Sequence, residues 1–335
     1  MMLNKKMILS IETSCDETSI AVLKDGKTLL ANVVSSQINK HKEYGGVMPE
    51  LASRLHLENI MYCIEEAIKE AKIDYKDITL IVYTKGPGLI GALHVGMQAA
   101  KALSIAYNTP LLGVDHMKGH IYASRYISDF KYPALTLVVS GGHTELVLMK
   151  GEYDFTLLGS TKDDAVGECY DKVSRVLGLG YPGGPVIDKL AHEGKPIYEL
   201  PYPHVDGNYD FSFSGLKTAV LNLVNHMKMK NISFKNEDVA ASFQNKVVDI
   251  LTDKVLLAMD EYKVKQVMLA GGVSANSALR EATEKRVKGK NSKVEVVLPP
   301  LWCCTDNGAM TAMAGYYSKD EESSLDAGVN PNLEL

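Results

Sequence analysis

Residues 134–150, ALTLVVSGGHTELVLMK, decide the fold because they repeat the plan of residues 7–24, MILSIETSCDETSIAVLK. Each stretch predicts an apolar strand, a turn of small or hydroxyl residues, and a second apolar strand. Each stretch also opens one half of the chain. The sequence therefore predicts an α/β protein with a duplicated mixed-sheet core.

A glycine-rich loop follows a strand in each half. Residues 78–83 predict a strand, and GPGLIG (86–91) predicts a loop that leads into a helix. In the other half, residues 266–270 predict a strand, and GGVS (271–274) predicts the loop before a helix. A strand, a glycine loop and a helix N-terminus together present backbone N–H groups to an anion. The repeated pattern predicts a nucleotide-like ligand.

The length of 335 residues favours two lobes facing a cleft. We expect a first lobe over residues 1–115 and a second lobe over 116–306 with the metal and nucleotide motifs. A C-terminal helix at about 307–318 is expected to pack back on the first lobe. Residues 319–335 are acidic and then rich in Asn and Pro, so we expect a loose tail there.

Composition limits the class of protein. The net charge of −5 argues against binding nucleic acid by bulk charge, so any such contact needs a local basic patch or a partner. No apolar stretch approaches the ~20 residues that span a bilayer. Five cysteines, odd in number and without C-x-x-C spacing, predict no disulfide framework and a cytoplasmic protein.

The motif HMKGH is a candidate metal site. On a helix, His116 and His120 share a face, although the same spacing also fits two surface or capping histidines. Met117 stands where the related H-E-x-x-H motif has its glutamate base, so activation of a hydrolytic water is not supported. Asp306 in TDNGAM is the best third ligand, or else the cap of the helix that follows it.

A dense run of carboxylates, DDAVGECYDK (163–172), precedes the loop YPGGP (181–185). At helical spacing the carboxylates form one acidic face, either solvated or ligand-binding. Two glycines between prolines indicate a close backbone approach, and carboxylates beside bare backbone suit the hydroxyls of a ribose-like group. Asn276, beside the second glycine loop, suits either a helix cap or an adenine or ribose contact.

Taken together, these motifs resemble the TsaD family, the bacterial members of a universal group once labelled glycoprotease. The resemblance covers nearly the whole chain, with nine motifs in family order. They are IETSCDETS (11–19), GPGLIGAL (86–93), HMKGH (116–120), VSGGHTE (139–145), DDAVGECYDKV (163–173), YPGGP (181–185), FSFSGLKT (211–218), GGVSANSALR (271–280) and TDNGAM (305–310).

The resemblance implies a two-lobed ASKHA-type fold, the architecture of actin, heat-shock chaperones and sugar kinases. The implied enzyme is a tRNA N6-adenosine threonylcarbamoyltransferase. It transfers the threonylcarbamoyl group from threonylcarbamoyl-AMP to N6 of adenosine 37, in tRNAs that read codons beginning with A, and so forms t6A.

The resemblance also implies the site residues. His116, His120 and Asp306 correspond to the ligands of one divalent metal, with Fe²⁺ favoured and Zn²⁺ as the alternative. No residue is assigned as a nucleophile. The implied substrate-binding residues are Val139, Ser140, Gly141, Gly142, His143, Asp171, Gly184, Asp188 and Asn276.

The implied partners are tRNA, a TsaB-type paralogue that binds the first lobe, and a TsaE-type ATPase, with no membrane involved. The predicted helix 49–72 carries Met61 and Tyr62 besides its core stripe, which suits either a partner surface or ordinary packing.

Two other classes stay open. A metalloprotease is disfavoured by Met117. The second class is a small-molecule kinase of the same fold, because the paired glycine loops would suit ATP equally well. Such a kinase would be expected to bind magnesium through carboxylates, without a histidine pair.

Overall fold

The computed structural model describes residues 4–319 and 321–335. Contacts divide the chain into two compact units. The first runs up to Ser128 and resumes at Thr305, and the second is Asp129–Cys304. The expected boundary after residue 115 differs from this division. The segment after β5 stays with the first unit because α4 (His116–Tyr122) and the 3-10 helix η3 (Ala123–Tyr126) pack against α11 (Gly308–Tyr317).

The first unit contains a five-stranded mixed sheet of order β3-β2-β1-β4-β5. Its strands are β1 (Met7–Glu12), β2 (Glu17–Lys24), β3 (Thr28–Ser36), β4 (Leu80–Gly86) and β5 (Leu111–Asp115). The first three strands pair antiparallel, while β4 and β5 run parallel to β1. The order in which strands are added therefore reverses between β1 and β4, since β2 and β3 lie on one side of β1 and β4 and β5 on the other. Ligands of open α/β sheets bind beyond the strand ends at such a point.

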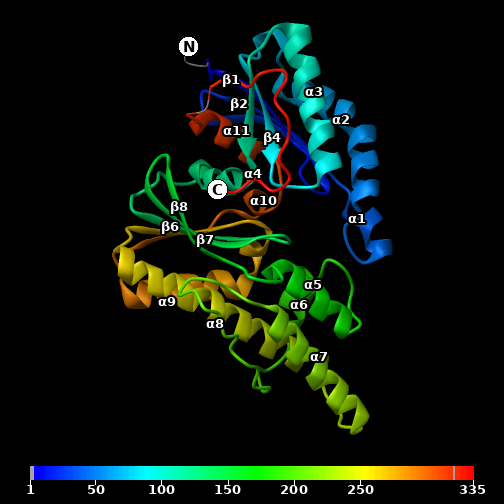
Figure 1. Cartoon of the computed structure of the whole chain (residues 1–335), viewed down its shortest axis with the longest axis vertical. Coiled ribbons are helices and arrows are strands. Elements are labelled where there is room, and N and C mark those ends of the chain that lie inside the picture. Colours follow the sequence, from blue (N-terminus) through cyan, green and yellow to red (C-terminus); the bar gives the residue numbers. More distant parts are fainter. Residues whose placement is uncertain (1–3, 320) are drawn as a thin grey trace. The chain divides into compact units, whose positions relative to one another are not determined.

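Helices lie on both faces of this sheet (Figure 1). Leu9, Ile11 and their neighbours on one face form a core with α2 (Pro49–Ala71) and α3 (Ile90–Tyr107). Alternate residues face α11, where a Cβ on Gly308 would come within 2.6 Å of Ala21 N and one on Gly315 within 2.5 Å of a Val82 methyl. These glycines let α11 lie directly on the strands.

The second unit repeats the plan with strand order β10-β9-β6-β7-β8. Its strands are β6 (Ala134–Val139), β7 (Thr144–Gly151), β8 (Asp154–Ser160), β9 (Gln266–Ala270) and β10 (Glu295–Val297). Again the first three strands pair antiparallel, and β9 and β10 run parallel to β6. The predicted duplication of a mixed sheet is confirmed.

Helices cover the second sheet, and the long α8 contributes much of the core. The helices of this unit are α5 (Val166–Val176), α6 (Gly183–Ala191), α7 (Ser214–Met229), α8 (Asn236–Tyr262), η4 (Gly272–Ala275), α9 (Ser277–Lys290) and α10 (Leu301–Cys304). Short helices α1 (Ile38–His41), η1 (Lys42–Tyr44) and η2 (Tyr75–Asp77) complete the first unit. In the described part of the chain, no helix is both long enough and apolar enough to cross a membrane.

The expectation of a loose tail is wrong for the described residues after Lys319. Ser323 N–H donates to Leu111 O on the edge strand β5 at 2.7 Å, and Asn330 N–H donates to Lys85 O on β4 at 2.7 Å. Edge strands leave backbone groups that another segment can pair with. The tail satisfies one such group at Leu111 and also bonds the inner strand β4 at Lys85, and its polar composition gave no sign of this pairing.

Candidate metal centre and substrate loops

A helix cap sets the position of the two histidines. The Asp115 carboxylate ends β5 and accepts hydrogen bonds from Met117 N at 2.7 Å and Lys118 N at 3.0 Å. This cap starts α4 at His116, so His120 follows one turn later on the same face. Both imidazoles are buried.

The alternative capping role of Asp306 belongs instead to its neighbour. Asn307 Oδ1 accepts from Met310 N at 3.1 Å and caps α11. Asp306 lies just before the cap, with Oδ1 3.0 Å from His120 Nε2 and 3.5 Å from His116 Nε2. The structure thus brings together all three residues of the predicted metal centre.

The geometry of this triad fits a metal ion. The three ligand atoms lie within 4.8 Å of one another, and the imidazole rings stand at 82°. Ligands about 2.1 Å from a tetrahedral ion lie ~3.4 Å apart, close to the distances from Asp306. Both ring nitrogens of His120 are buried and make no hydrogen bond of acceptable geometry within the described chain. A buried polar group without a partner calls for one.

Glu12, which ends β1, is a residue that the sequence analysis missed. Its carboxylate is fully buried and accepts hydrogen bonds from Ser14 N at 2.7 Å, from Thr311 Oγ1 at 2.9 Å and from the Thr84 hydroxyl. His116 Nδ1 lies 3.4 Å from Glu12 Oε2. An ionised carboxylate only accepts, so Nδ1 carries a proton toward Glu12, and Nε2 faces Asp306, where it would offer its lone pair to a metal once its own proton is displaced.

Electrostatics show that the centre attracts positive charge. Burial lowers the pKa of His116, but the carboxylates of Asp306 and Glu12 outweigh burial and raise it to about 9. Burial raises the pKa of Glu12, but His116 outweighs it and leaves the net pKa lowered. A proton or a metal cation can supply the charge that the two carboxylates stabilise.

The cysteine thiols do not suit covalent catalysis. Burial, followed by the nearby Asp16 and Asp306 carboxylates, raises the pKa of Cys15 well above its usual value. Burial likewise raises the pKa of Cys169 and of Cys303 to about 12. Protonated thiols are poor nucleophiles.

In the second unit, the turn between β6 and β7 carries the first group of implied substrate residues. Ser140 N–H donates to His143 O at 2.8 Å, which closes the turn around Gly141 and Gly142. Both glycines are exposed, and a Cβ on either would meet no atom within 4 Å. Gly167 N–H donates to Ser140 O at 3.1 Å, so the N-terminus of α5 lies against this turn.

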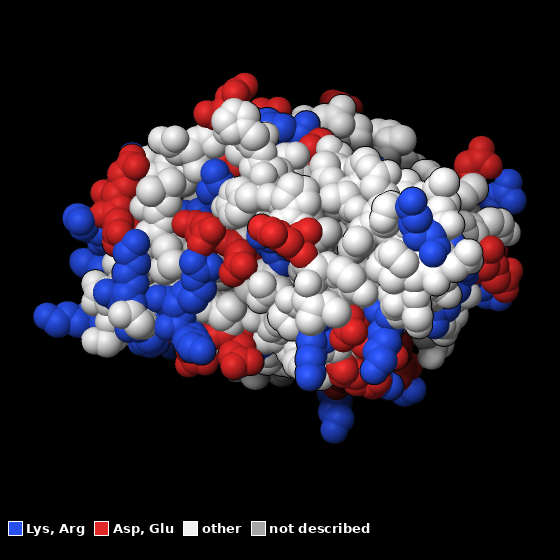
Figure 2. Space-filling view, turned by 90° about the horizontal axis from the view of Figure 1, so that it is seen from below, with Lys and Arg blue, Asp and Glu red and all other residues white. Residues whose placement is uncertain are grey.

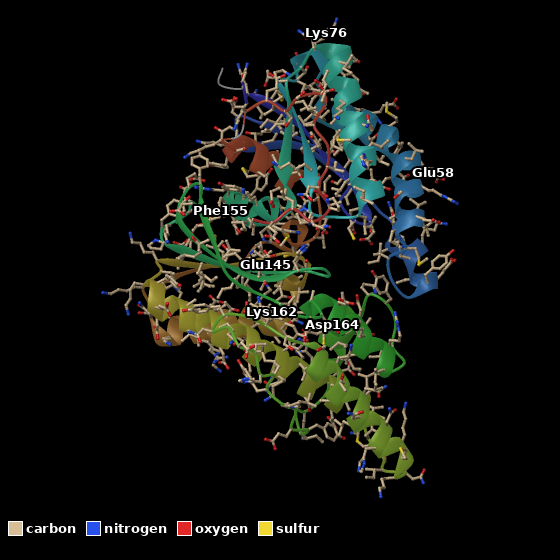
Figure 3. The ribbon with its side chains drawn as sticks, in the orientation of Figure 1. Glu58, Lys76, Glu145, Phe155, Lys162 and Asp164 are labelled. Carbon is tan, nitrogen blue, oxygen red and sulfur yellow. The ribbon has the colours of Figure 1, made fainter. Side chains whose placement is uncertain are left out.

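Ion pairs and hydrogen bonds within the protein largely neutralise the carboxylates of the acidic run 163–172. Asp164, labelled in Figure 3, precedes α5. Its Oδ1 lies 2.8 Å from Lys172 Nζ, and its Oδ2 lies 3.1 Å from Lys217 Nζ. Asp171 Oδ1 accepts from Gly183 N at 2.6 Å and so holds the start of α6 against α5. The next residue, Gly184, has open space where a Cβ would stand.

Asp188 and Asn276 meet through Gln244 of α8, a buried residue that the sequence analysis also missed. Gln244 Nε2 donates to Asp188 Oδ1 at 3.0 Å, and its Oε1 accepts from Asn276 Nδ2 at 2.8 Å. Asn276 Oδ1 caps α9 by accepting from Leu279 N at 2.9 Å, so its capping role is confirmed. This network holds α6, α8 and α9 together.

The implied substrate residues gather beyond the C-terminal ends of β6 and β9. Val139 ends β6, and Gly271 follows β9 at a φ of +85°, where a Cβ would come within 2.4 Å of Val139 O. These parallel neighbours flank the reversal of strand order, the place where open sheets bind ligands.

Comparison with known proteins decides the family. The model of the TsaD family, described as tRNA N6-adenosine threonylcarbamoyltransferase, matches residues 28–313. The chain belongs to this family. A relative of that name from Bacillus subtilis (strain 168) is 54% identical over 331 residues, covering 98% of this chain and 95% of the relative. One from Bacillus thuringiensis (strain Al Hakam) is 53% identical over 332 residues, covering 98% of this chain and 96% of the relative.

Solved structures show the same fold at low sequence identity. Full-length HypF matches with a TM-score of 0.61 and 16% identity over 92% of this chain and 46% of HypF. Component A of the (R)-2-hydroxyglutaryl-CoA dehydratase of Acidaminococcus fermentans matches with a TM-score of 0.54 and 15% identity, over 93% and 97% of the two chains. The expected ASKHA-type fold is confirmed.

Proposed function

We propose that this member of the TsaD family transfers a threonylcarbamoyl group from threonylcarbamoyl-AMP to N6 of adenosine 37 of tRNAs that read codons beginning with A. The observation that carries this proposal is the convergence of His116, His120 and Asp306 within a chain of this family. A tRNA substrate and five free thiols fit a cytoplasmic enzyme.

The metal in this proposal is Fe²⁺, with Zn²⁺ as the alternative. His116 and His120 would each bind it through Nε2, and Asp306 through Oδ1. Two imidazoles and one carboxylate are borderline ligands that leave coordination positions open. When bound, a metal there supplies positive charge for the phosphate oxygens of the donor. Glu12 would keep the His116 ring oriented for this role.

The implied residues of the second unit would bind the adenylate part of the donor. Gly141 and Gly142 are exposed and Gly184 is half-buried, and the open space at each of the three leaves room for a ligand beside the backbone. The carboxylates of Asp171 and Asp188 already bond the starts of α6 and α9, so they would also fix the loops that carry these glycines.

The chemistry needs no covalent intermediate. An acyl-adenylate is a mixed anhydride, so its carbonyl is already activated, which agrees with the protonated thiols near the centre. The exocyclic amine of adenine is a poor nucleophile, and positioning would therefore supply much of the rate. The target base lies in a single-stranded loop, where a protein can reach it.

An exposed apolar face on α2 supports the proposed paralogue partner. Leu57, Met61 and Tyr62 are 70%, 54% and 65% exposed, while Ile60 and Ile64 of the same helix are buried against the sheet. Glu58, labelled in Figure 3, lies on the exposed side of the helix. Core packing thus accounts for only one face of α2. We propose that the other face receives a TsaB-type paralogue, which works with a TsaE-type ATPase.

The test is t6A formation with and without these partners. We expect the isolated chain to bind tRNA weakly and make little t6A, because its net charge is −5, and the partners to restore multiple turnovers. Leu57→Glu with Met61→Glu should abolish the stimulation, since both side chains are exposed apolar groups. Lys69→Ala, an exposed change on the same helix, is the matched control. Full multiple-turnover activity of the chain alone would contradict the need for partners.

A further inference from the structure

The parallel strands of the second sheet all begin at one edge. Ala134 of β6 and Glu295 of β10 both pair in register with Gln266, the first residue of β9. Because α8 ends just before β9 and α9 just before β10, both helices also end at this edge. Lys290 Nζ lies 2.5 Å from Asp260 Oδ2 and ties the two helix ends together.

Lysines crowd this edge, which we call the basic end. Residues 262–293 contain eight Lys or Arg and only two Asp or Glu, in a chain whose net charge is −5. Figure 2 shows Lys and Arg side chains gathered toward the left of the view, where α8 and α9 end in Figure 1. The exposed lysines of the basic end are Lys263, Lys265, Lys285, Lys288, Lys290 and Lys293.

Most of these lysines have no carboxylate to neutralise them. Asp260 is paired with Lys290, and Glu295 Oε2 lies 2.5 Å from Lys131 Nζ. The Glu261 carboxylate accepts a hydrogen bond from the Tyr209 hydroxyl. The other five lysines of the basic end form no ion pair with any residue that the structure describes. Positive charge at this edge is therefore in excess and open to solvent.

We propose that the basic end binds phosphates of the tRNA backbone. The proposal rests on the proposed function, which makes tRNA the substrate. Lysines act as flexible point charges and suit contacts that do not depend on sequence. Protein interfaces, by contrast, are poor in Lys and have apolar or aromatic centres, whereas the exposed residues between these lysines include Gly289, Asn291 and Ser292.

The basic end lies at the opposite edge of the sheet from the implied substrate loops. The five residues of β9 separate these edges by about 17 Å at ~3.3 Å per residue. The lysines would therefore hold a part of the tRNA other than the reacting base. Phosphate contacts position a nucleic acid, while contacts to the base select it. The basic end would thus supply affinity and orientation without taking part in the transfer.

The test compares two triple variants of the full chain. The first is Lys265→Ala, Lys285→Ala and Lys293→Ala, which removes three exposed lysines without breaking an ion pair among the described residues. The control removes the same charge from another surface of the same unit, as Lys228→Ala, Lys230→Ala and Lys235→Ala. Binding to unmodified tRNA transcript is measured from 50 to 200 mM salt, and the KM for tRNA is measured with the partners present.

We expect the first variant to bind tRNA roughly 10- to 100-fold more weakly at ~0.1 M salt, with the slope of log K against log salt reduced by about 2 to 3. The control should keep the wild-type slope, and both variants should bind a non-hydrolysable adenylate analogue like the wild type.

Equal losses in both variants would overturn the proposal, since bulk charge would then explain the binding. The proposal would also be overturned if the first variant kept wild-type affinity for tRNA but no longer bound a partner protein, because this edge would then be a protein interface. If the wild type makes no t6A with partners present, the proposed function fails. If the wild type makes t6A and the first variant binds tRNA as tightly as the wild type, the basic-end proposal is refuted and the proposed function stands.

Discussion

Replacing His120 with Ala is expected to remove the metal and reduce threonylcarbamoyl transfer by at least about 100-fold. Loss of a residue that only orients a metal ligand already lowers metal affinity 10- to 100-fold, and loss of a ligand should do more. The fold should remain intact, because the ring of His120 contacts Asp306 at 3.0 Å but makes no hydrogen bond of acceptable geometry within the described residues. Elemental analysis checks the loss of metal, and cooperative thermal unfolding checks that the fold is intact.

His116→Ala provides the matched comparison. It should also remove the metal, but it leaves the buried Glu12 carboxylate without its cationic neighbour. We expect the free energy of unfolding of His116→Ala to be roughly 2–3 kcal/mol lower than that of His120→Ala, because breaking a buried ion pair is strongly destabilising. The remaining hydrogen bonds to Glu12 keep the loss from being larger. Stoichiometric metal in either variant would refute the ligand assignment.

Gly184→Val is expected to abolish adenylate binding with little change in stability. A Cβ at Gly184 would meet no atom within 4 Å, so the free chain has room for the side chain, and a ligand beside the backbone would collide with it. Calorimetry with a non-hydrolysable adenylate analogue measures the affinity, and thermal unfolding measures the stability.

Two nearby glycines make this test specific. Gly180→Val also enters open space, but Gly180 is not among the implied substrate residues, so adenylate affinity should be unchanged. Gly183→Ala should destabilise the protein itself, because its Cβ would lie 2.5 Å from Tyr170 O. Unchanged affinity in Gly184→Val would remove this glycine from the donor site.

Local patterns in the sequence predicted the elements that depend on nearby residues. The strand–turn–strand plan in residues 7–24 and 134–150 gave the duplicated sheets, and the spacing of His116 and His120 gave a shared helix face. Asp306 was found as a candidate ligand, but only the structure shows that Asn307 takes the cap and leaves Asp306 facing the histidines.

The sequence analysis missed residues whose roles depend on distant partners. Glu12 ends an apolar strand, and a carboxylate at that position was a signal in the sequence that it has a special role. Its hydrogen-bond partners Thr84 and Thr311, however, come from far along the chain. Gln244 lies on the apolar face of α8, where an isolated amide gave the same kind of signal. The basic end was missed although Lys285, Lys288, Lys290 and Lys293 are close in sequence, and the parallel strands that begin at the same edge add Lys263 and Lys265 to them.

The most direct test of a metal-assisted transferase is t6A formation by one preparation before and after metal removal. The purified chain is combined with its partners, unmodified tRNA and threonylcarbamoyl-AMP, and t6A is quantified by mass spectrometry of digested tRNA. We predict that chelation stops t6A formation, that Fe²⁺ restores it in the wild type, and that Fe²⁺ does not restore it in His120→Ala. Undiminished t6A formation by protein shown to be free of metal would contradict the account.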